Sequence, residues 1–473
     1  MSQKKSASRY ASDSVGKIAM PDNALWGDQT QRSLEYFNIG RHQFDNRLIK
    51  ALVTIKYACA QVNRDEGLLE QELYEAITTG CEAVLQGHYY EQFPLYVWQT
   101  GSGTQTNMNV NEVISSLANM YLNECRDEGS GNQSVVHPND HVNMSQSSND
   151  VFPSAMHLVV AQLTHETLFT SLDQLETELA QKQVEFNDVA MVGRTHLMDA
   201  LPLTVGAVLS AFCAQLAEVK AAIMDSVERV YSLAIGGTAV GSGSNAPQAF
   251  GKTVCALLEK QYALPFRSHS NLYAAVSGED ALLRYSASLK QLASMLFKMV
   301  NDFRLLGSGP RCGFNEWQLP ANEPGSSIMP GKVNPTQCEA LSMVCLQVFG
   351  NDLTVSLAAS QGQLQLNTYR PVIIHNVMES IELLSDAMSS FAKNCVNGFT
   401  LNEHQIAANM TANLSTITVL APKLGYDIAA QIVHEAYSRN VSLGEASETL
   451  GFYRHTEFEQ LLNDLLLEQQ NGP

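Results

Sequence analysis

Helical periodicity constrains the fold of this chain more than any other feature of its sequence. Apolar residues recur at alternating spacings of three and four at residues 168–179, 205–223, 285–303, 339–357 and 377–391. Such spacings place an apolar stripe along one side of an α-helix. Because several of these stretches belong to helices longer than the globular average, they predict a bundle of long helices. Some are apolar on more than one face, as at Met295, Leu296, Met299 and Val300, which favours burial against a second subunit over one large monomeric bundle.

Signals for β-structure and for domain boundaries are fewer. Short strands are expected at residues 94–98 and around Gln318 and Leu319. Boundaries are expected near residue 146, before the first long helix, and near residue 403, after Asn397 and Gly398. The sequence therefore predicts a mainly α chain with an N-terminal mostly helical domain at 1–146, a central helical bundle at 147–403 and a small C-terminal helical domain at 404–473.

The charge balance limits the partners of the chain. Its 29 lysines and arginines face 48 aspartates and glutamates, which gives a net charge of −19. A field of this sign repels phosphate backbones and anionic lipids, so neither a nucleic acid nor a membrane is an expected partner. A small anionic substrate is compatible with this charge if a local cluster of donors builds a positive potential at the site.

The cysteines and the N-terminal segment bear on the compartment. The nine cysteines are scattered and never spaced as CxxC, which indicates neither a disulfide framework nor a zinc or iron–sulfur site. Lys4 and Lys5 are not followed by the apolar core of a secretory signal. We see no uninterrupted apolar run of the roughly 18 residues that a membrane helix needs. A reducing, cytoplasmic location is therefore expected.

Four stretches rich in hydroxyl, amide and glycine residues each precede a long helix. They lie at residues 100–107, 145–150, 193–199 and 325–334. Helix N-termini carry unpaired N–H groups and a partial positive charge, so such segments attract anions. Each stretch alone is more typical of a helix cap, and Asn149 or Asp150 ahead of Pro153 fits a cap. The four together are richer in donors than caps require and predict a composite anion site.

The other motifs indicate neither a cofactor nor a metal. Five residues separate Gly325 from Gly331 and Val333 follows Lys332, so this loop lacks the spacing of a P-loop. The segment 236–243 likewise fails the dinucleotide-binding spacing. No histidines and carboxylates have metal-ligand spacing on one helix face.

Two histidines stand among polar neighbours. His196 lies between Arg194 and Asp199 and just ahead of Pro202, which suits a helix start and a titrating role. His137-Pro-Asn-Asp140 is, on its own, typical of a turn.

The stretch Gly325-Ser-Ser-Ile-Met-Pro-Gly-Lys-Val-Asn-Pro335 resembles the signature loop of the fumarase/aspartase superfamily, whose members eliminate across a C–N or C–O bond and release fumarate. Other segments resemble that superfamily in its own order, at residues 98–109, 137–143, 145–150, 193–196, 236–241 and 309–313. Within it, residues 330–340 and the stretch from His196 to Ala200 are similar to class II fumarases, the metal-free type. Aspartases usually carry alanine in place of Gly331.

This resemblance implies a fold, an assembly and a reaction. The fold would be a three-domain, almost all-α chain whose central helices form the core of a homotetramer. Each active site would draw on three subunits, which explains why the donor-rich segments lie far apart in the chain. The reaction would be the reversible trans addition of water to the small dicarboxylate fumarate, which gives (S)-malate in the tricarboxylic acid cycle, without metal or cofactor.

The resemblance also assigns roles to individual residues. Ser326 would be the general base that removes the C3 proton, His196 the partner that handles the water, and Glu339 the residue that orients His196. The two carboxylates would be held by Ser102, Thr104, Ser147, Ser148, Asn149, Thr195, Ser327, Lys332 and Asn334.

A secondary dicarboxylate site of the family is expected to be weak or missing. It would be built around His137, Asn139 and Asp140, and many relatives carry a basic residue three positions before the histidine. Ser134 stands there in this chain. An anion would then depend on neutral donors, which contribute less than charged ones.

Two other functions share these motifs. An ammonia-lyase acting on aspartate or argininosuccinate would differ after Pro335 and around His196. A catalytically inactive structural relative could lose Ser326, His196 or Lys332, and this chain keeps all three.

Overall fold

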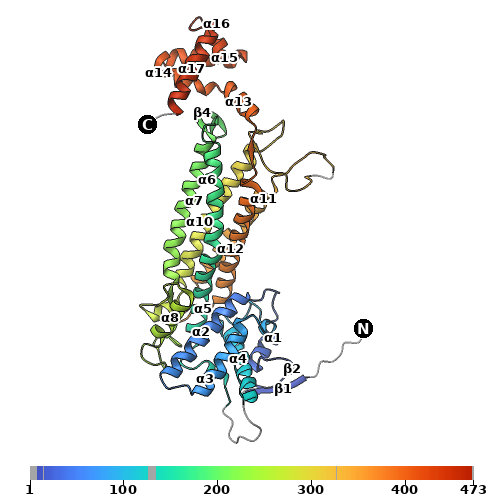
Figure 1. The fold of residues 1–473 in the computed structure, drawn as a ribbon, viewed down its shortest axis with the longest axis vertical. Coiled ribbons are helices and arrows are strands. Elements are labelled where there is room, and N and C mark those ends of the chain that lie inside the picture. Colours follow the sequence, from blue (N-terminus) through green and yellow to red (C-terminus); the bar gives the residue numbers. More distant parts are fainter. Residues whose placement is uncertain (1–7, 14, 126–134, 326–327, 471–473) are drawn as a thin grey trace. The chain divides into compact units, whose positions relative to one another are not determined.

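The computed structural model describes residues 8–13, 15–125, 135–325 and 328–470, and it is mainly helical, as the sequence predicts (Figure 1). The α-helices are α1 (Asp28–Tyr36), α2 (Asn46–Asp65), α3 (Gln71–Leu85), α4 (Thr104–Cys125), α5 (Ser148–Leu163), α6 (Phe169–Glu185), α7 (Val205–Val230), α8 (Phe250–Tyr262), α9 (Leu272–Ser277), α10 (Asp280–Leu306), α11 (Thr336–Ala359), α12 (Arg370–Phe391), α13 (Glu403–Ala412), α14 (Ile417–Leu424), α15 (Tyr426–Arg439), α16 (Leu443–Thr449) and α17 (His455–Gln470). Short 3₁₀ or π turns are η1 (Tyr90–Gln92), η2 (Pro138–Val142), η3 (Thr164–Leu168), η4 (Ala392–Val396) and η5 (Leu414–Thr416).

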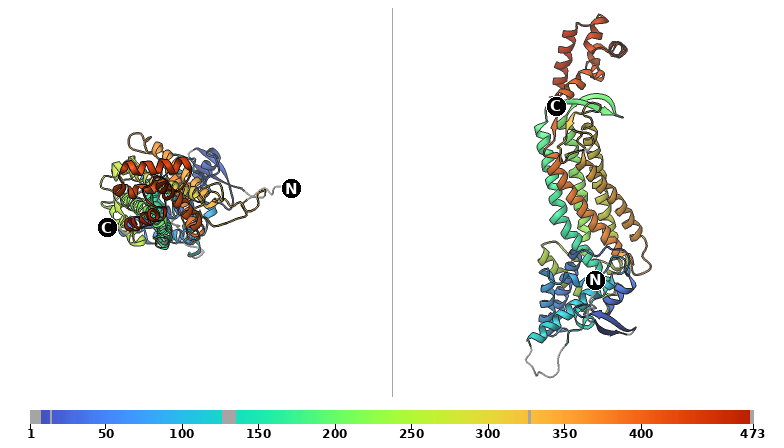
Figure 2. Two further views of the ribbon diagram at one scale, coloured as in Figure 1. Left: turned by 90° about the horizontal axis from the view of Figure 1, so that it is seen from above. Right: turned by 90° about the vertical axis from the view of Figure 1, so that its right-hand side faces the viewer.

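The long helices confirm the periodicity argument. Each of the five predicted stretches lies in one of α6, α7, α10, α11 and α12, apart from Leu168, which ends η3 immediately before α6. Helices α7 and α10 are 26 and 27 residues long. Their apolar stripes are buried, and Phe303 of α10 packs edge-on against Phe391 of α12. Figures 1 and 2 show the five helices running side by side.

The contacts divide the chain into two compact units. Unit 1 comprises Met1–Phe169, Ala221–Gln291 and Leu346–Leu383, and unit 2 comprises Thr170–Lys220, Leu292–Cys345 and Leu384–Pro473. Each unit is described by itself below. The three-domain division expected from the sequence stays a prediction.

Helix α2 forms the centre of unit 1. It packs against α3, α5 and α8, and it is buried on nearly every side, as Leu52, Val53, Ile55 and Cys59 show. The run Leu-Val-Thr-Ile-Lys-Tyr-Ala-Cys-Ala explains this position, because it is apolar almost all round. Its one lysine, Lys56, is fully buried.

Unit 2 contains a separate apolar core near the C-terminus. Leu420, Ile432, Leu443 and Phe458, from α14, α15, α16 and α17, belong to one buried cluster. These short helices match the expectation for the last segment of the chain.

The strands form two-stranded sheets in the described residues. They are β1 (Ser8–Asp13) with β2 (Gly16–Pro21), β3 (Ala190–Thr195) with β4 (Met198–Thr204), β5 (Ser232–Leu233) with β6 (Arg267–Ser268), and β7 (Trp317–Gln318) with β8 (Thr400–Leu401). The β5–β6 pair is parallel and the other three are antiparallel. Strand β7 confirms the expectation at Gln318. The strand expected at 94–98 is wrong, because Tyr96 makes only an isolated bridge with Gln43.

Two helices are more apolar along their length than the sequence reading allowed. By length and composition alone, α7 and α11 are long and apolar enough to cross a membrane. Such helices also occur in the cores of proteins without membrane spans, where they are apolar on more than one face. In α11 one set of apolar residues is buried, including Leu341, Cys345, Val348 and Val355, and another is exposed, namely Met343, Leu346, Leu353 and Leu357.

Candidate active site

Unit 1 joins three of the predicted binding hydroxyls. The Oγ of Ser102 lies 2.7 Å from Oγ1 of Thr104, and Oγ1 of Thr104 lies 2.7 Å from Oγ of Ser148. Thr104 and Ser148 are the first residues of α4 and α5, so two helix N-termini meet at this hydroxyl chain. Helix N-termini with free hydroxyl donors favour an anion.

Glycines allow the first donor loop its close contacts. A Cβ on Gly101 would lie 1.4 Å from the carbonyl oxygen of Thr368, so no side chain fits there. Gly103 has a φ of +75°, and a Cβ on it would lie 2.4 Å from the ring of Phe152. Both features are specific to glycine and bring Ser102 and Thr104 against α5 and the residues before α12.

A capping box fixes the second donor segment. Ser147 is the N-cap of α5: its Oγ accepts from the N–H of Asn149 at 3.2 Å, and its own N–H donates to Asp150 at 2.9 Å. The cap expected at Asn149 or Asp150 therefore lies at Ser147. Asn149 instead donates its Nδ2 to the carbonyl of Ala239 at 2.8 Å.

Asp150 holds a further loop against the same segment. Its buried carboxylate accepts from the N–H groups of Gly236 at 3.0 Å and Thr238 at 2.8 Å. Burial raises the pKa of Asp150, although these backbone N–H groups oppose the shift. The glycine segment 236–243, which lacked a dinucleotide spacing, thus packs behind the candidate site.

Lys56 supports the donor segment from the core, a role that the sequence reading missed. Its Nζ donates to Oδ1 of Asn143 at 2.7 Å and to Oε1 of Gln146 at 3.0 Å. Burial lowers the pKa of Lys56 to about 8. The available signal was a lysine inside the mostly apolar run from Leu52 to Ala60.

Unit 2 presents His196 at the tip of the β3–β4 hairpin. Thr195 pairs with Met198, and the two residues between them, His196 and Leu197, have φ values of 56° and 63°. Two positive φ values are typical of a type I′ hairpin turn. The helix start expected at His196 is therefore wrong: strand β4 lies between this residue and α7. Thr195 and His196 are exposed.

A buried ion pair anchors the base of this hairpin. Arg194 donates from both terminal nitrogens to the two carboxylate oxygens of Glu316, at 2.9 and 2.7 Å. Glu316 is fully buried and also accepts from Nδ2 of Asn409 at 2.7 Å. Such bidentate pairs fix orientation, so the anchor restricts the hairpin that carries His196.

The signature loop lies in unit 2 as well. Lys332, Asn334 and Glu339 line a common cavity with residues 307–310 and 317–319. Nδ2 of Asn334 donates to the carbonyl of Gly325 at 2.8 Å, which closes the loop. Lys332 is exposed, and no ion pair involves it in the described part of the chain. Ser326 and Ser327 lie outside the described residues.

Glu339 stands in the first turn of α11. The structure contains no hydrogen bond between it and His196 within the residues that it describes. The predicted orienting contact therefore stays a prediction.

The candidate secondary site is a short π turn, η2. The N–H of Asp140 donates to Nδ1 of His137 at 3.2 Å, and the Asp140 carboxylate lies 3.1 Å from the same nitrogen. This carboxylate opposes an anion beside His137. Asn139 is exposed, and Ser134 lies outside the described residues.

Comparisons with known proteins identify the family of the chain. A family model described as lyase matches residues 16–350, and one described as the fumarase C C-terminus matches residues 417–466. The chain is 49% identical over 453 residues to fumarate hydratase class II of Pseudomonas putida, covering 96% of this chain and 97% of that protein. It is 50% identical over 453 residues to fumarate hydratase class II 1 of Pseudomonas aeruginosa, with the same coverage.

Solved structures show the same fold. The crystal structure of class II fumarase from Schistosoma mansoni superposes with a TM-score of 0.92 at 42% identity, covering 97% of this chain and 98% of that one. A fumarate lyase:delta crystallin from Brucella melitensis, bound to cobalt, gives a TM-score of 0.91 at 37% identity, with 98% and 99% coverage. With its hydroxyl-lined helix N-termini and its signature loop, the chain belongs to the class II fumarate hydratase family of lyases.

Proposed function

We propose that this lyase catalyses the reversible trans addition of water to fumarate, giving (S)-malate. The observation that carries the proposal is the hydroxyl chain Ser102–Thr104–Ser148 at two helix N-termini, in a chain about half identical to fumarate hydratases over nearly its whole length. Ser147 and Asn149, beside this chain, complete the donors that unit 1 offers to a carboxylate.

The chemistry explains why so many donors are needed. Removing the proton next to a carboxylate of malate places a second negative charge on that carboxylate in the transition state. Preorganised donors stabilise such charge because they need no reorganisation when it forms. We assign Thr195, Ser327, Lys332 and Asn334 to this task together with the donors of unit 1. Lys332 supplies a local positive charge for the substrate carboxylate in a chain of net charge −19.

We assign proton transfer to Ser326 and His196. Ser326 would take the C3 proton, its alkoxide stabilised by backbone N–H groups of the glycine-rich loop. His196 would take a proton from the water that adds to fumarate, or return one to the hydroxyl that leaves malate. His196 lies at the exposed tip of the β3–β4 hairpin, where its ring can exchange a proton with a molecule outside the hairpin. Glu339 would orient its ring.

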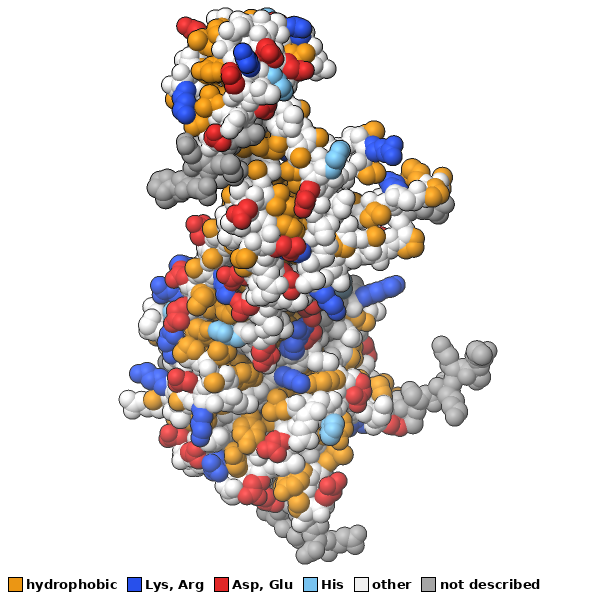
Figure 3. Space-filling view, turned by 45° about the horizontal axis from the view of Figure 1, so that its top comes forward, with side chains coloured by type: hydrophobic (Ala, Val, Ile, Leu, Met, Phe, Trp, Pro, Cys, Tyr) orange, Lys and Arg blue, Asp and Glu red, His pale blue; other side chains and the backbone are white. Residues whose placement is uncertain are grey.

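We also propose a homotetramer in which three subunits form each site. The exposed apolar side of α11, with Met343, Leu346, Leu353 and Leu357, supports this assembly, because spacings of three, seven and four form a stripe suited to another helix. Apolar side chains are also visible among charged ones on the surface in Figure 3. Leu197 and Met198 expose 66% and 70% of their surface beside His196, as expected for a tip that enters a neighbouring subunit.

Two organisational proposals accompany the function. The separate buried cluster of α14–α17 supports a C-terminal domain within residues 404–473, beside domains at 1–146 and 147–403. The cysteines are unpaired, which supports a reducing, cytoplasmic location.

An absorbance assay tests the function. The purified protein should consume fumarate and produce malate, and the reaction should run in both directions. Aspartate and argininosuccinate should not yield fumarate. Release of fumarate from either amino compound, or no turnover of any of the three, would contradict the proposal. Activity should persist in EDTA, and a loss restored by a divalent ion would contradict the metal-free mechanism.

A further inference from the structure

The carbonyl of Asn149 lacks its ordinary helical partner. In an α-helix this carbonyl accepts from the N–H four residues later. Here that residue is Pro153, which lies inside α5 and has no N–H. Asn149 is one of the proposed carboxylate-binding residues, so the sequence leaves an unfilled acceptor at the candidate site.

The side chain of Arg370 fills this position. Its Nη1 donates to the carbonyl of Asn149 at 2.8 Å, across 221 residues of sequence. Its Nη2 donates to the carbonyl of Val276 in the last turn of α9 at 2.6 Å, and its Nε donates to Glu279 at 2.6 Å. One guanidinium thus connects the starts of α5 and α10 with the end of α9.

The backbone of Arg370 holds the other donor loop. Its N–H donates to the carbonyl of Gly101 at 3.0 Å. Gly101 also lies close to the carbonyl of Thr368, two residues before Arg370. This close approach is the reason that Gly101 has no room for a side chain. Both carboxylate-binding segments of unit 1 are therefore attached to a single residue, the first of α12.

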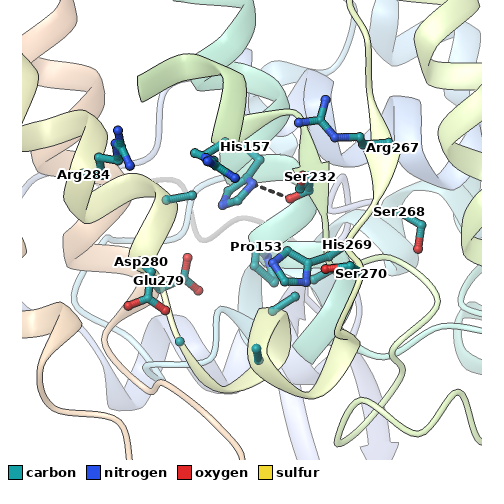
Figure 4. Close-up of a pocket in the computed structure, with 16 residues that line it drawn as sticks. Pro153, His157, Ser232, Arg267, Ser268, His269, Ser270, Glu279, Asp280 and Arg284 are labelled. Atoms are coloured by element: carbon teal, nitrogen blue, oxygen red, sulfur yellow. Dashed lines mark hydrogen bonds between the residues drawn. The ribbon is translucent and has the colours of Figure 1, made fainter. Parts of the chain in front are cut away.

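The ion pair between Arg370 and Glu279 is buried, with side-chain exposures of 0% and 1%. Replacing a buried pair of this kind by apolar residues often leaves stability unchanged or raises it, so burial alone gives no reason for its presence. Glu279 and Pro153 also line a cavity of about 480 Å³, together with His157, Arg267, His269 and Arg284 (Figure 4). Glu279 thus borders this cavity, whereas the side chain of Arg370 is fully buried.

We propose that Arg370 is a positioning residue for substrate binding, which holds the Ser102–Thr104 and Ser147–Asn149 segments at the spacing that a substrate carboxylate requires. Glu279 fixes the orientation of the Arg370 guanidinium through their ion pair. The inference rests on the proposed hydratase function. A lysine cannot substitute, because one ammonium group lacks the planar fork that donates in three fixed directions.

The test compares Arg370→Lys with a matched control in the same unit. Arg370→Lys should raise KM for fumarate and the inhibition constant of a non-reacting dicarboxylate by about tenfold, the effect of one lost charged hydrogen bond. Its kcat should fall as well, by no more than about tenfold, because the donors that Arg370 positions also stabilise the extra charge of the transition state. The control Asp352→Asn removes a buried carboxylate that accepts from Ser286 and Lys290 between α10 and α11. It should lower Tm without changing KM.

A second change supplies the missing donor directly. Pro153→Ala restores an N–H that can donate to the carbonyl of Asn149. In the Arg370→Lys background it should recover at least a third of the lost affinity, whereas alone it should leave KM within about twofold. Position 153 is not among the residues proposed to bind substrate. A lower KM on adding Pro153→Ala to Arg370→Lys would therefore not be expected if Arg370 only stabilised the fold.

The outcomes separate the two proposals. A parent protein that does not turn over fumarate overturns the hydratase function. An active parent whose Arg370→Lys variant keeps its KM and inhibition constant overturns the positioning role, even if Tm falls. If Arg370→Lys does not assemble, Glu279→Gln replaces it, because it keeps the shape of the side chain and an oxygen that can accept from Nε of Arg370. It should raise KM several-fold, and an unchanged KM overturns the inference.

Discussion

The donor segments of unit 1 and those of unit 2 are held in different ways. In unit 1, Ser102, Thr104 and Ser148 bond to one another, and Lys56, Asp150 and Arg370 fix the surrounding backbone from the interior. In unit 2, His196 and Lys332 stand on exposed segments. The hydrogen bonds that hold these segments lie away from the two side chains, at Arg194–Glu316 and Asn413–Ala200 for the hairpin and at Asn334–Gly325 for the loop. We therefore propose that the donors of unit 1 are organised before substrate arrives, whereas those of unit 2 are completed by further contacts.

Substitution of the proposed acid and base should give the largest effect. His196→Asn and Ser326→Ala should each lower turnover about 10²- to 10⁴-fold, the usual contribution of general acid–base groups, with assembly unchanged by sedimentation. His434→Asn, at an exposed position of α15 in the same unit, is the control and should keep parent activity. Near-normal turnover in either variant would remove that residue from the mechanism.

Removal of the positive charge of Lys332 should have the next largest effect, which is on the binding of fumarate. Lys332→Met should raise KM for fumarate about ten- to hundredfold, because a charged hydrogen bond contributes about 1.5–3 kcal/mol. Lys393→Met, at another exposed position of unit 2, should leave KM unchanged. An equal change in both variants would attribute the effect to net charge and not to the site.

A break in the row of hydroxyls Ser102–Thr104–Ser148 should weaken substrate binding less, because the neighbouring donors of unit 1 remain in place. Thr104→Val keeps the shape of the side chain but separates Ser102 from Ser148, and should raise KM about five- to tenfold, as expected for a neutral hydrogen bond. The control is Thr78→Val in α3, whose hydroxyl donates to the carbonyl of Tyr74. A KM for Thr104→Val equal to that of the control would show that the hydroxyls of Ser102, Thr104 and Ser148 do not bind substrate.

The lowered pKa of the buried Lys56 should make the stability of the protein depend on pH. Burial lowers its pKa to about 8, from 10.5 for an unperturbed lysine. Between these values the unfolded chain keeps a proton that the folded chain has released, so this group adds stability as pH rises through the window. The Tm of the parent minus that of Lys56→Met should therefore increase from pH 7.5 to pH 9.5. Lys252→Met, at an exposed position of α8, should give a flat difference. A flat or falling difference for Lys56 would contradict a lowered pKa of this group in the folded chain.

The smallest effect is expected at the turn η2. His137→Asn should leave turnover within a few-fold of the parent, because the carboxylate of Asp140 already occupies the side of the ring at which an anion would bind. Titration calorimetry with a non-reacting malate analogue should give one class of dicarboxylate site per active centre. A second class that disappears in His137→Asn would show that the turn binds anions despite Ser134.

Most of the helices could be predicted from the sequence, whereas the roles of the candidate site residues stay predictions. Spacings of three and four lie within one helix, so the stripes of α7, α10 and α12 are readable without any long-range contact. The donor segments were equally visible, since the four helix starts together carry more Ser, Thr and Asn than caps alone require. The resemblance of residues 325–335 to a signature loop then supplied roles for Ser326, Lys332 and Asn334.

The tertiary structure decided what those residues touch. The hairpin that carries His196 was expected to be a helix start, because two successive positive φ values leave little trace in a sequence without glycine. The contact between Arg370 and Asn149 spans 221 residues and that between Arg194 and Glu316 spans 122, so neither has a local signature. A lysine within an apolar helix and a proline four residues after a carbonyl were visible from the start. Their partners depended on where distant segments of the chain pack, because hydrogen bonds of this kind form only after the helices have brought their ends together.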